Sequence, residues 1–138
     1  MKKKRYVIDA WAILAFLQKE EPAAFRIKEI LEEAEQEKVE IFLSIINLGE
    51  VYYRVGKVRG EKEAEETLEE IRNLPIQNIP VDEKKVLEAG KFKIRYPISY
   101  ADAFAAAASY ALSATLLTGD PELFLLQNEI DIEKLTRT

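Results

Sequence analysis

The chain has 138 residues, of which 48% are hydrophobic and 33% are charged, and this balance is typical of one globular, soluble domain with a single core. It contains neither His nor Cys, which excludes a thiol nucleophile, a Ser-His-Asp triad, a Cys/His zinc site and a disulfide framework. The net charge of −5 argues against a general nucleic-acid coat protein, because affinity for phosphates depends on Lys and Arg. We therefore expect a single domain over residues 1–138.

Common nucleotide-binding motifs, membrane segments and targeting signals are also missing from the sequence. Neither GxGxxG nor GxxxxGK[ST] occurs, so the usual dinucleotide and P-loop phosphate cradles are absent. The apolar stretch 101–117 includes Asp102 and two serines and is too short to span a membrane. No signal peptide is visible after the basic residues 2–5, and the lack of Cys fits a reducing compartment. We expect a cytoplasmic protein without a membrane segment.

The hydrophobic pattern predicts strands that alternate with helices along the whole chain. Residues 22–38, for example, carry apolar side chains at helical spacing behind Pro22, which suits a first helical turn. In chain order, the expected elements are a strand at 4–8, helices at 10–18 and 22–38, a strand at 40–44, helices at 45–58 and 60–74, a strand at 76–81, helices at 82–96 and 100–113, a strand at 114–117, a short helix at 121–127 and an edge strand at 130–135.

This order of elements predicts an α/β fold with three layers. Strands joined through helices form right-handed parallel crossovers, and the helices then cover both faces of the sheet. We expect a central, mostly parallel sheet of about four to five strands. In such open sheets the ligand site lies outside the carboxyl ends of the strands.

Four acidic residues stand where the predicted fold would bring them to that end of the sheet: Asp9, Glu50, Asp102 and Asp120. Asp9 and Asp120 directly follow strands, whereas Glu50 and Asp102 lie near the beginnings of helices. Clustered carboxylates without His or Cys suit a hard divalent cation such as Mg²⁺, which prefers oxygen ligands and bridges carboxylates to phosphates. The pattern favours metal-dependent cleavage of a phosphodiester.

Each acid also has an ordinary structural interpretation. Asp9 could cap the helix at 10–18, Asp102 could complete a capping box with Ser99, and Asp120 before a proline could cap the helix at 121–127. Glu50 could pair with the Arg one helical turn later. The helix around Glu50 is apolar on nearly all sides in sequence, however, and an acid buried there is costly unless it is paired or binds a metal.

The motifs around the four acids, VIDAWAILAFL, INLGEVYYR, ISYADAFAAA and LLTGDPEL, resemble those of PIN-domain ribonucleases, and most closely the VapC toxins of prokaryotic toxin–antitoxin pairs. The similarity covers essentially the whole chain. It implies a PIN-like fold in which Asp9, Glu50, Asp102 and Asp120 are the catalytic and metal-binding residues. It also implies an endoribonuclease dependent on Mg²⁺ or Mn²⁺, an RNA substrate, a cognate antitoxin and a homodimer.

The resemblance leaves three positions near the site open. Thr118 would be a polar neighbour of the acids, and Glu122 could be an additional ligand or an ordinary acid in a first helical turn. Many relatives carry a small polar residue two places after the first Asp, where this chain has Trp11.

Basic and aromatic residues flank the acids. They could guide phosphates toward the acidic site and stack unpaired bases, or they could be solvated helix charges and core side chains. The basic residues are Arg54, Lys57 and Arg59 after Glu50, and Lys91, Lys93 and Arg95 before Asp102; the tyrosines are Tyr52, Tyr53, Tyr96 and Tyr100.

Three alternatives to a toxin nuclease follow from the same residues. The chain could be a PIN-domain nuclease of RNA maturation, or a non-catalytic interaction domain that keeps the fold. An aspartate-nucleophile phosphatase also places Asp after its first strand, but it normally carries a second acid two residues later, where this chain has Trp11.

Overall fold

A central sheet of five parallel strands organises the computed structural model, which describes residues 2–138. The strands lie in the order β3-β2-β1-β4-β5, and their bounds are β1 (Lys4–Ile8), β2 (Val39–Ser44), β3 (Gln77–Ile79), β4 (Thr115–Thr118) and β5 (Asp131–Lys134). The helices are α1 (Ala10–Leu17), α2 (Ala23–Glu35), α3 (Ile45–Arg59), α4 (Glu61–Arg72), α5 (Glu83–Arg95), α6 (Tyr100–Leu112) and the short 3₁₀ helix η1 (Leu123–Leu126).

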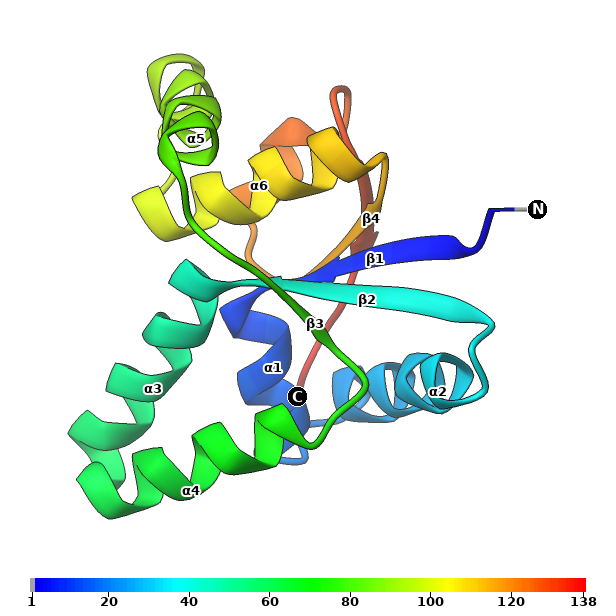
Figure 1. Ribbon diagram of the computed structural model, residues 1–138, viewed down its shortest axis with the longest axis vertical. Helices are drawn as coiled ribbons and strands as arrows, with labels where there is room; N and C mark the ends of the chain where they lie inside the picture. Colours follow the sequence, from blue (N-terminus) through cyan, green and yellow to red (C-terminus); the bar gives the residue numbers. More distant parts are fainter. Residues whose placement is uncertain (1) are drawn as a thin grey trace.

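Helices cover both faces of the sheet, which confirms the predicted three-layer α/β/α fold. Figure 1 shows α5 and α6 on one side of the sheet and α1, α2, α3 and α4 on the other. Helix α6 packs directly on β1, β2 and β4, and α5 packs on α6. The opposite layer is built from α1 and α2 near the sheet and from the α3–α4 pair beside them.

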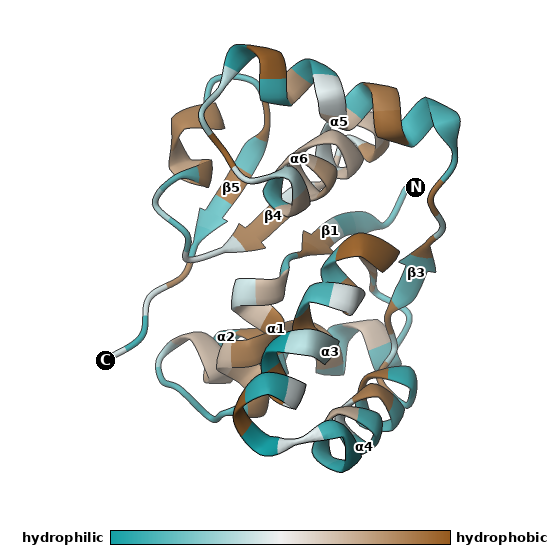
Figure 2. Ribbon diagram, turned by 90° about the vertical axis from the view of Figure 1, so that its left-hand side faces the viewer, coloured by the Kyte–Doolittle hydropathy of each residue, from teal (hydrophilic) through white to brown (hydrophobic). Residues whose placement is uncertain are grey.

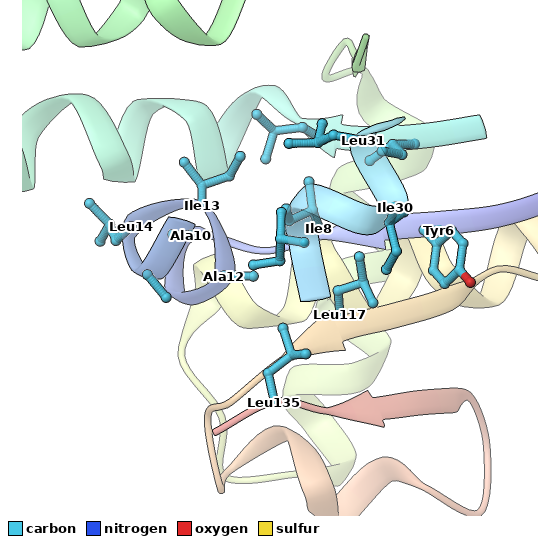
Figure 3. Close-up of a cluster of buried hydrophobic side chains, with 14 of the residues drawn as sticks. Tyr6, Ile8, Ala10, Ala12, Ile13, Leu14, Ile30, Leu31, Leu117 and Leu135 are labelled. Carbon is cyan, nitrogen blue, oxygen red and sulfur yellow. The ribbon is translucent and has the colours of Figure 1, made fainter. Parts of the chain in front are cut away.

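The alternation of side chains along the strands divides the core into two parts. In β1, Tyr6 and Ile8 belong to the cluster under α1 and α2, whereas Val7 belongs to the cluster under α5 and α6. In β4, Leu117 and Leu116 are divided in the same way. Figure 3 shows the first cluster, where Ile8, Ile13, Ile30 and Leu117 meet between the sheet and its helices. Both faces of the central strands are buried, which explains their continuous apolar runs.

The neighbouring strands β1 and β4 are followed by segments on opposite faces of the sheet. Helix α1 follows β1 into one layer, whereas η1 after β4 contributes Leu123 and Leu126 to the core of the other. In Figure 1, β1 and β2 run from right to left, and α1 and α3 begin at their left-hand ends. Such a switch point leaves a crevice outside the carboxyl ends of the strands.

Two expectations are corrected by the structure. The predicted helix at 121–127 is a four-residue 3₁₀ helix, so Asp120 does not cap an α-helix there. The apolar side chains around Glu50 are not all buried: in α3 only Asn47, Leu48 and Val51 are buried, and Tyr53 and Val58 are exposed. The cause is that α3 packs mainly against α4, α6 and α1 and leaves its remaining face to solvent.

The remaining predicted bounds agree with the structure to within three residues, the largest difference being the end of α2 at Glu35, and the predicted strand at 76–81 is shortened to the edge strand β3. Gly60 ends α3 and begins α4 with φ of 95°, a backbone conformation that favours glycine. Within residues 2–138, no helix combines the length and the apolar character needed to cross a membrane.

Candidate metal centre

Asp9 lies at the carboxyl end of β1 and caps α1. Its Oδ1 accepts a hydrogen bond from the Ala12 N–H at 2.8 Å, and its residue is only 1% exposed. Its second oxygen, Oδ2, is buried and has no hydrogen-bond partner among residues 2–138. Burial raises the pKa of the Asp9 carboxyl to about 7, against the opposing effect of the Thr118 hydroxyl and the Ala12 N–H.

Asp102, on α6, and Asp120, after β4, lie next to each other. Asp102 lies in the first turn of α6, where its N–H donates to Ser99 Oγ at 3.1 Å, and Asp120 follows β4 in the next turn. Burial, followed by the hydrogen bond and the negative charge of the adjacent Asp120 carboxylate, raises the pKa of Asp102 to about 8. Carboxylates this close repel one another unless a proton or a cation lies between them.

Glu122 joins this pair. Carboxylate oxygens of Asp102, Asp120 and Glu122 lie within 4.8 Å of one another, a spacing that one metal ion could bridge. The N–H of Glu122 donates to Asp120 Oδ1 at 3.0 Å, and the Asp120 N–H donates to Thr118 Oγ1 at 3.0 Å. The turn after β4 is therefore held by local hydrogen bonds that fix the direction of Asp120.

Glu50 reaches the same region from α3. Its Oε2 forms an ion pair with Arg54 at 2.9 Å, the structural pairing that the sequence suggested, while its Oε1 is buried without a hydrogen-bond partner in the described chain. The side chain is 12% exposed. The charges of Asp120 and Glu50 both raise the pKa of Asp9, and the charge of Asp9 raises that of Asp102. The four acids therefore lie in one region of the structure, and among the described residues it is Asp102, Asp120 and Glu122 that meet the 4.8 Å spacing.

Two buried carboxylate oxygens without a hydrogen-bond partner indicate whether these residues could bind a metal ion. A buried carboxylate oxygen without a donor loses its hydration and gains nothing in return. Asp9 Oδ2 and Glu50 Oε1 are both in this state, and within residues 2–138 no Lys or Arg forms an ion pair with Asp9. A hard divalent cation bound by carboxylate oxygens would satisfy both atoms, so the donor set fits Mg²⁺ or Mn²⁺.

Asn47 is a neighbour of this site that the sequence reasoning missed. It lies one helical turn before Glu50, is fully buried and donates from Nδ2 to the Ala101 carbonyl at 3.1 Å. This bond ties α3 to the first turn of α6, next to Asp102. The Asn47 Oδ1 is also buried without a partner in the part of the chain that the structure describes. The available signal was one amide in the otherwise apolar run IINL.

Trp11 occupies space beside the turn that carries Asp120. A Cβ atom added to Gly119 would overlap the Trp11 ring, so the ring lies directly against the Gly119 backbone. Arg137 also lies beside the ring, with its guanidinium 4.9 Å from the ring centroid. At this position the chain therefore has a packing contact where many relatives carry a small polar side chain.

The tyrosines noted in the sequence divide into two groups. Tyr52 donates to Glu65 Oε1 at 2.7 Å and Tyr96 hydrogen-bonds Glu129, so both are held by acids away from the site. Tyr53 and Tyr100 are 51% and 48% exposed.

Comparisons with known proteins agree with this fold. Solved structures with the same fold include VapBC2 from Rickettsia felis bound to a DNA fragment from its promoter (TM-score 0.74, 18% identity, 96% of this chain and 99% of that chain covered). They also include the Mycobacterium tuberculosis VapC20, a sarcin-ricin loop cleaving toxin (0.69, 13%, 87% and 93%), and PAE2754 from Pyrobaculum aerophilum (0.68, 15%, 94% and 89%). No curated protein sequence matches the chain.

The sequence itself also matches a known family. The profile of the PIN domain matches residues 6–127, a span that includes the end of β1, the four acids and η1. Since this match covers most of the 138 residues, the chain belongs to the PIN-domain family.

Proposed function

We propose that the chain is a divalent-metal-dependent endoribonuclease and the toxin of a VapBC-type toxin–antitoxin pair. The observation that carries the proposal is the pair of buried, unpartnered carboxylate oxygens on Asp9 and Glu50, beside the close acids Asp102 and Asp120. Among proteins with this fold are a toxin that cleaves the sarcin-ricin loop and VapBC complexes, and these support the choice of RNA and of an antitoxin partner.

In this proposal Asp9, Glu50, Asp102 and Asp120 hold one or two Mg²⁺ or Mn²⁺ ions, and Glu122 is an additional candidate ligand. A divalent cation supplies an activated water nucleophile at neutral pH and positive charge opposite the scissile phosphate. The Ala12 N–H fixes the direction of the Asp9 carboxylate. Arg54 holds Glu50 at the margin of the site, and Asn47 holds α3 against α6.

The other parts of the proposal concern the protein in its cell. We propose that residues 1–138 form one domain that acts in the cytoplasm as a homodimer, and that a cognate antitoxin blocks its site. A PIN-domain nuclease of RNA maturation is the second candidate, since it would use the same acids. A toxin would harm its host cell when its antitoxin is absent, whereas a nuclease of RNA maturation would not.

The first prediction tests the chemistry. Purified protein should cleave single-stranded RNA with Mg²⁺ or Mn²⁺ but not with EDTA, and it should leave 5′-phosphate and 3′-hydroxyl ends. The reason is that the chain has no His to activate the RNA 2′-hydroxyl. Asp9→Asn should reduce the rate by orders of magnitude, as expected for loss of a metal ligand.

Asp82→Asn is the matched control for this experiment. Asp82 caps α5 as Asp9 caps α1, with Oδ1 accepting the Lys85 N–H at 2.9 Å, but it is exposed and outside the acidic cluster. Its substitution should leave cleavage unchanged. Cleavage in EDTA with 2′,3′-cyclic phosphate ends, or equal activity of Asp9→Asn and Asp82→Asn, would exclude the proposed mechanism.

A further inference from the structure

A cleft of about 500 Å³ opens between α1, α3 and the C-terminal segment. Its lining comprises Leu14, Gln18, Tyr53, Arg54, Val55, Lys57, Val58, Arg59 and Arg137. Four of these residues are basic, and none of the described residues that line the cleft is acidic. The basic lining of this cleft contrasts with the chain as a whole, which has a net charge of −5.

Two of the four cleft cations are already paired, Arg54 with Glu50 and Arg137 with Glu20, and the other two differ from Lys93 and Arg95 on α5. In the described structure, Lys57 and Arg59 are exposed and form no ion pair with an acid. On α5, by contrast, Lys93 donates to the Ile98 carbonyl at 2.7 Å and Arg95 pairs with Glu129 at 2.8 Å. The sequence suggested both groups as phosphate-guiding margins, and the structure leaves the group on α3 more available.

The cleft adjoins the acidic site through two contacts. On α3, Arg54 of the cleft forms the ion pair with Glu50. At the C-terminal segment, Arg137 lies over the Trp11 ring, which in turn lies against Gly119, the residue before Asp120. A ligand in the cleft would therefore lie next to the acids.

Side chains on α3 form a continuous path from the acids into the cleft. Glu50, Tyr53 or Arg54, and Lys57 follow one another at intervals of three or four residues, so they share one helix face. The Tyr53 ring is half exposed, and Lys57 Nζ lies 5.5 Å from its centroid. An exposed aromatic ring flanked by cations suits a strand with alternating bases and phosphates.

We propose that this cleft binds a single-stranded segment of RNA that leads to the acidic site. Lys57, Arg59 and Arg137 contact its phosphates, and Tyr53 stacks on one of its bases. This inference rests on the proposed nuclease function, to which it adds the location of the substrate. The charge of the cleft favours a polyanion, and RNA binding by these contacts weakens as salt rises.

The test measures RNA binding separately from cleavage. All variants carry Asp102→Asn, so that labelled single-stranded RNA stays intact, and affinity is measured across a series of salt concentrations. Lys57→Gln/Arg137→Gln should weaken binding about tenfold and lower the salt dependence by about 1.4, because each phosphate contact on a single strand contributes about 0.7 to the slope. The matched control Lys84→Gln/Lys91→Gln removes two exposed cations from α5 and should change affinity less than about twofold.

A second variant guards against misfolding, because Arg137 also pairs with Glu20 at 2.9 Å. Lys57→Gln/Arg59→Gln removes two cations that hold no acid and should give the same loss of affinity. If the cleft and α5 variants lost RNA affinity equally, the loss would reflect total charge and the proposal would be overturned. It would also be overturned if neither cleft variant lost affinity for RNA.

Three further outcomes separate this inference from others. If the cleft variants bind RNA normally but lose binding to a polyglutamate probe, the cleft binds an acidic protein segment and the RNA proposal is wrong. If RNA is cut by the chain with metal while the cleft variants bind it normally, the cleft proposal fails and the nuclease stands. If RNA binds in the cleft but is never cut, the nuclease fails and the cleft stands.

Discussion

At the scale of single residues, one carboxylate oxygen can have a structural role while the other is free for a ligand. Asp9 caps α1 through Oδ1 and Glu50 pairs with Arg54 through Oε2, whereas Asp9 Oδ2 and Glu50 Oε1 have no hydrogen-bond partner among residues 2–138. The structural and the functional interpretations of these acids are therefore compatible. Capping also fixes the direction of the free oxygen, so the carboxylate side chain loses less conformational entropy when it binds a ligand.

The raised pKa values of Asp9 and Asp102 predict how stability depends on pH. Their pKa values are about 7 and about 8 in the folded protein, so the folded state holds protons that the unfolded state releases above its ordinary carboxyl pKa of about 4. This stabilisation is complete below pH 4 and is lost as pH rises to about 8. We expect the melting temperature in EDTA to fall by several degrees over that range.

Two comparisons check this dependence. Asp102→Asn should flatten the fall and should leave the metal-free melting temperature at pH 8 unchanged or higher, because it removes one of the repelling charges. Glu32→Gln, an exposed acid on α2, should leave the profile as it is. Added Mg²⁺ should stabilise the native protein at pH 8 more than Asp102→Asn. A flat profile for the native chain in EDTA would contradict the close arrangement of the acids.

The sequence places these four acids at one end of the sheet, where their role as ligands stays a prediction, but it does not give the atoms around them. Strand ends and helix beginnings place Asp9, Glu50, Asp102 and Asp120 at one end of the sheet, and that follows from periodicity and topology alone. Asn47 was missed because a single amide in an apolar helix is common, and its partner Ala101 is far away in sequence. Such contacts depend on tertiary packing, which local patterns do not contain.

At the scale of elements, caps and apolar periods determined most of the boundaries. Ser44, Asp82 and Ser99 accept N–H hydrogen bonds at the beginnings of α3, α5 and α6, where the sequence had placed helix starts. The exposed face of α3 could not be predicted in this way, because its apolar composition suggested burial on nearly all sides. The face of α3 that is covered is the one that packs against α4, and the face that lines the cleft beside α1 stays open.

The turn between β4 and η1 has a packing requirement of its own. Gly119→Ala would push a methyl group into the Trp11 ring, and we expect it to destabilise the fold by about 1–3 kcal/mol. Replacing the ring as well, in Trp11→Ala/Gly119→Ala, should cost less than the sum of the two single changes, because the two residues are in contact. Urea unfolding of the three variants measures this coupling.

Gly90→Ala is the control for this prediction. A Cβ at Gly90, within α5, meets no atom within 4 Å, so the change should be neutral or stabilise the helix by up to about 1 kcal/mol. If Gly119→Ala and Gly90→Ala had the same effect on unfolding, the close approach of Trp11 to the turn would be wrong.

At the scale of the whole molecule, the fold concentrates acids and cations in adjoining regions. The switch point between β1 and β4 gathers the carboxylates, while α3 and the C-terminal segment gather cations beside them. Figure 2 shows the same division of layers from the side, with polar residues prominent on the α3–α4 pair. An acidic site with a basic approach can receive a polyanion even though the chain as a whole is negative.

The last prediction distinguishes a toxin from a nuclease of RNA maturation. Expression of the isolated chain in bacteria should arrest growth, because an endoribonuclease without its antitoxin would cut cellular RNA repeatedly. Asp102→Asn should remove the effect at matched protein levels, since it takes one carboxylate from the close group of Asp102, Asp120 and Glu122 and keeps the size of the side chain. Asp82→Asn should arrest growth like the native chain. Growth curves with quantified protein measure all three. If the native chain and Asp102→Asn were equally harmless while the native protein still cut RNA in solution, a role in RNA maturation would replace the toxin.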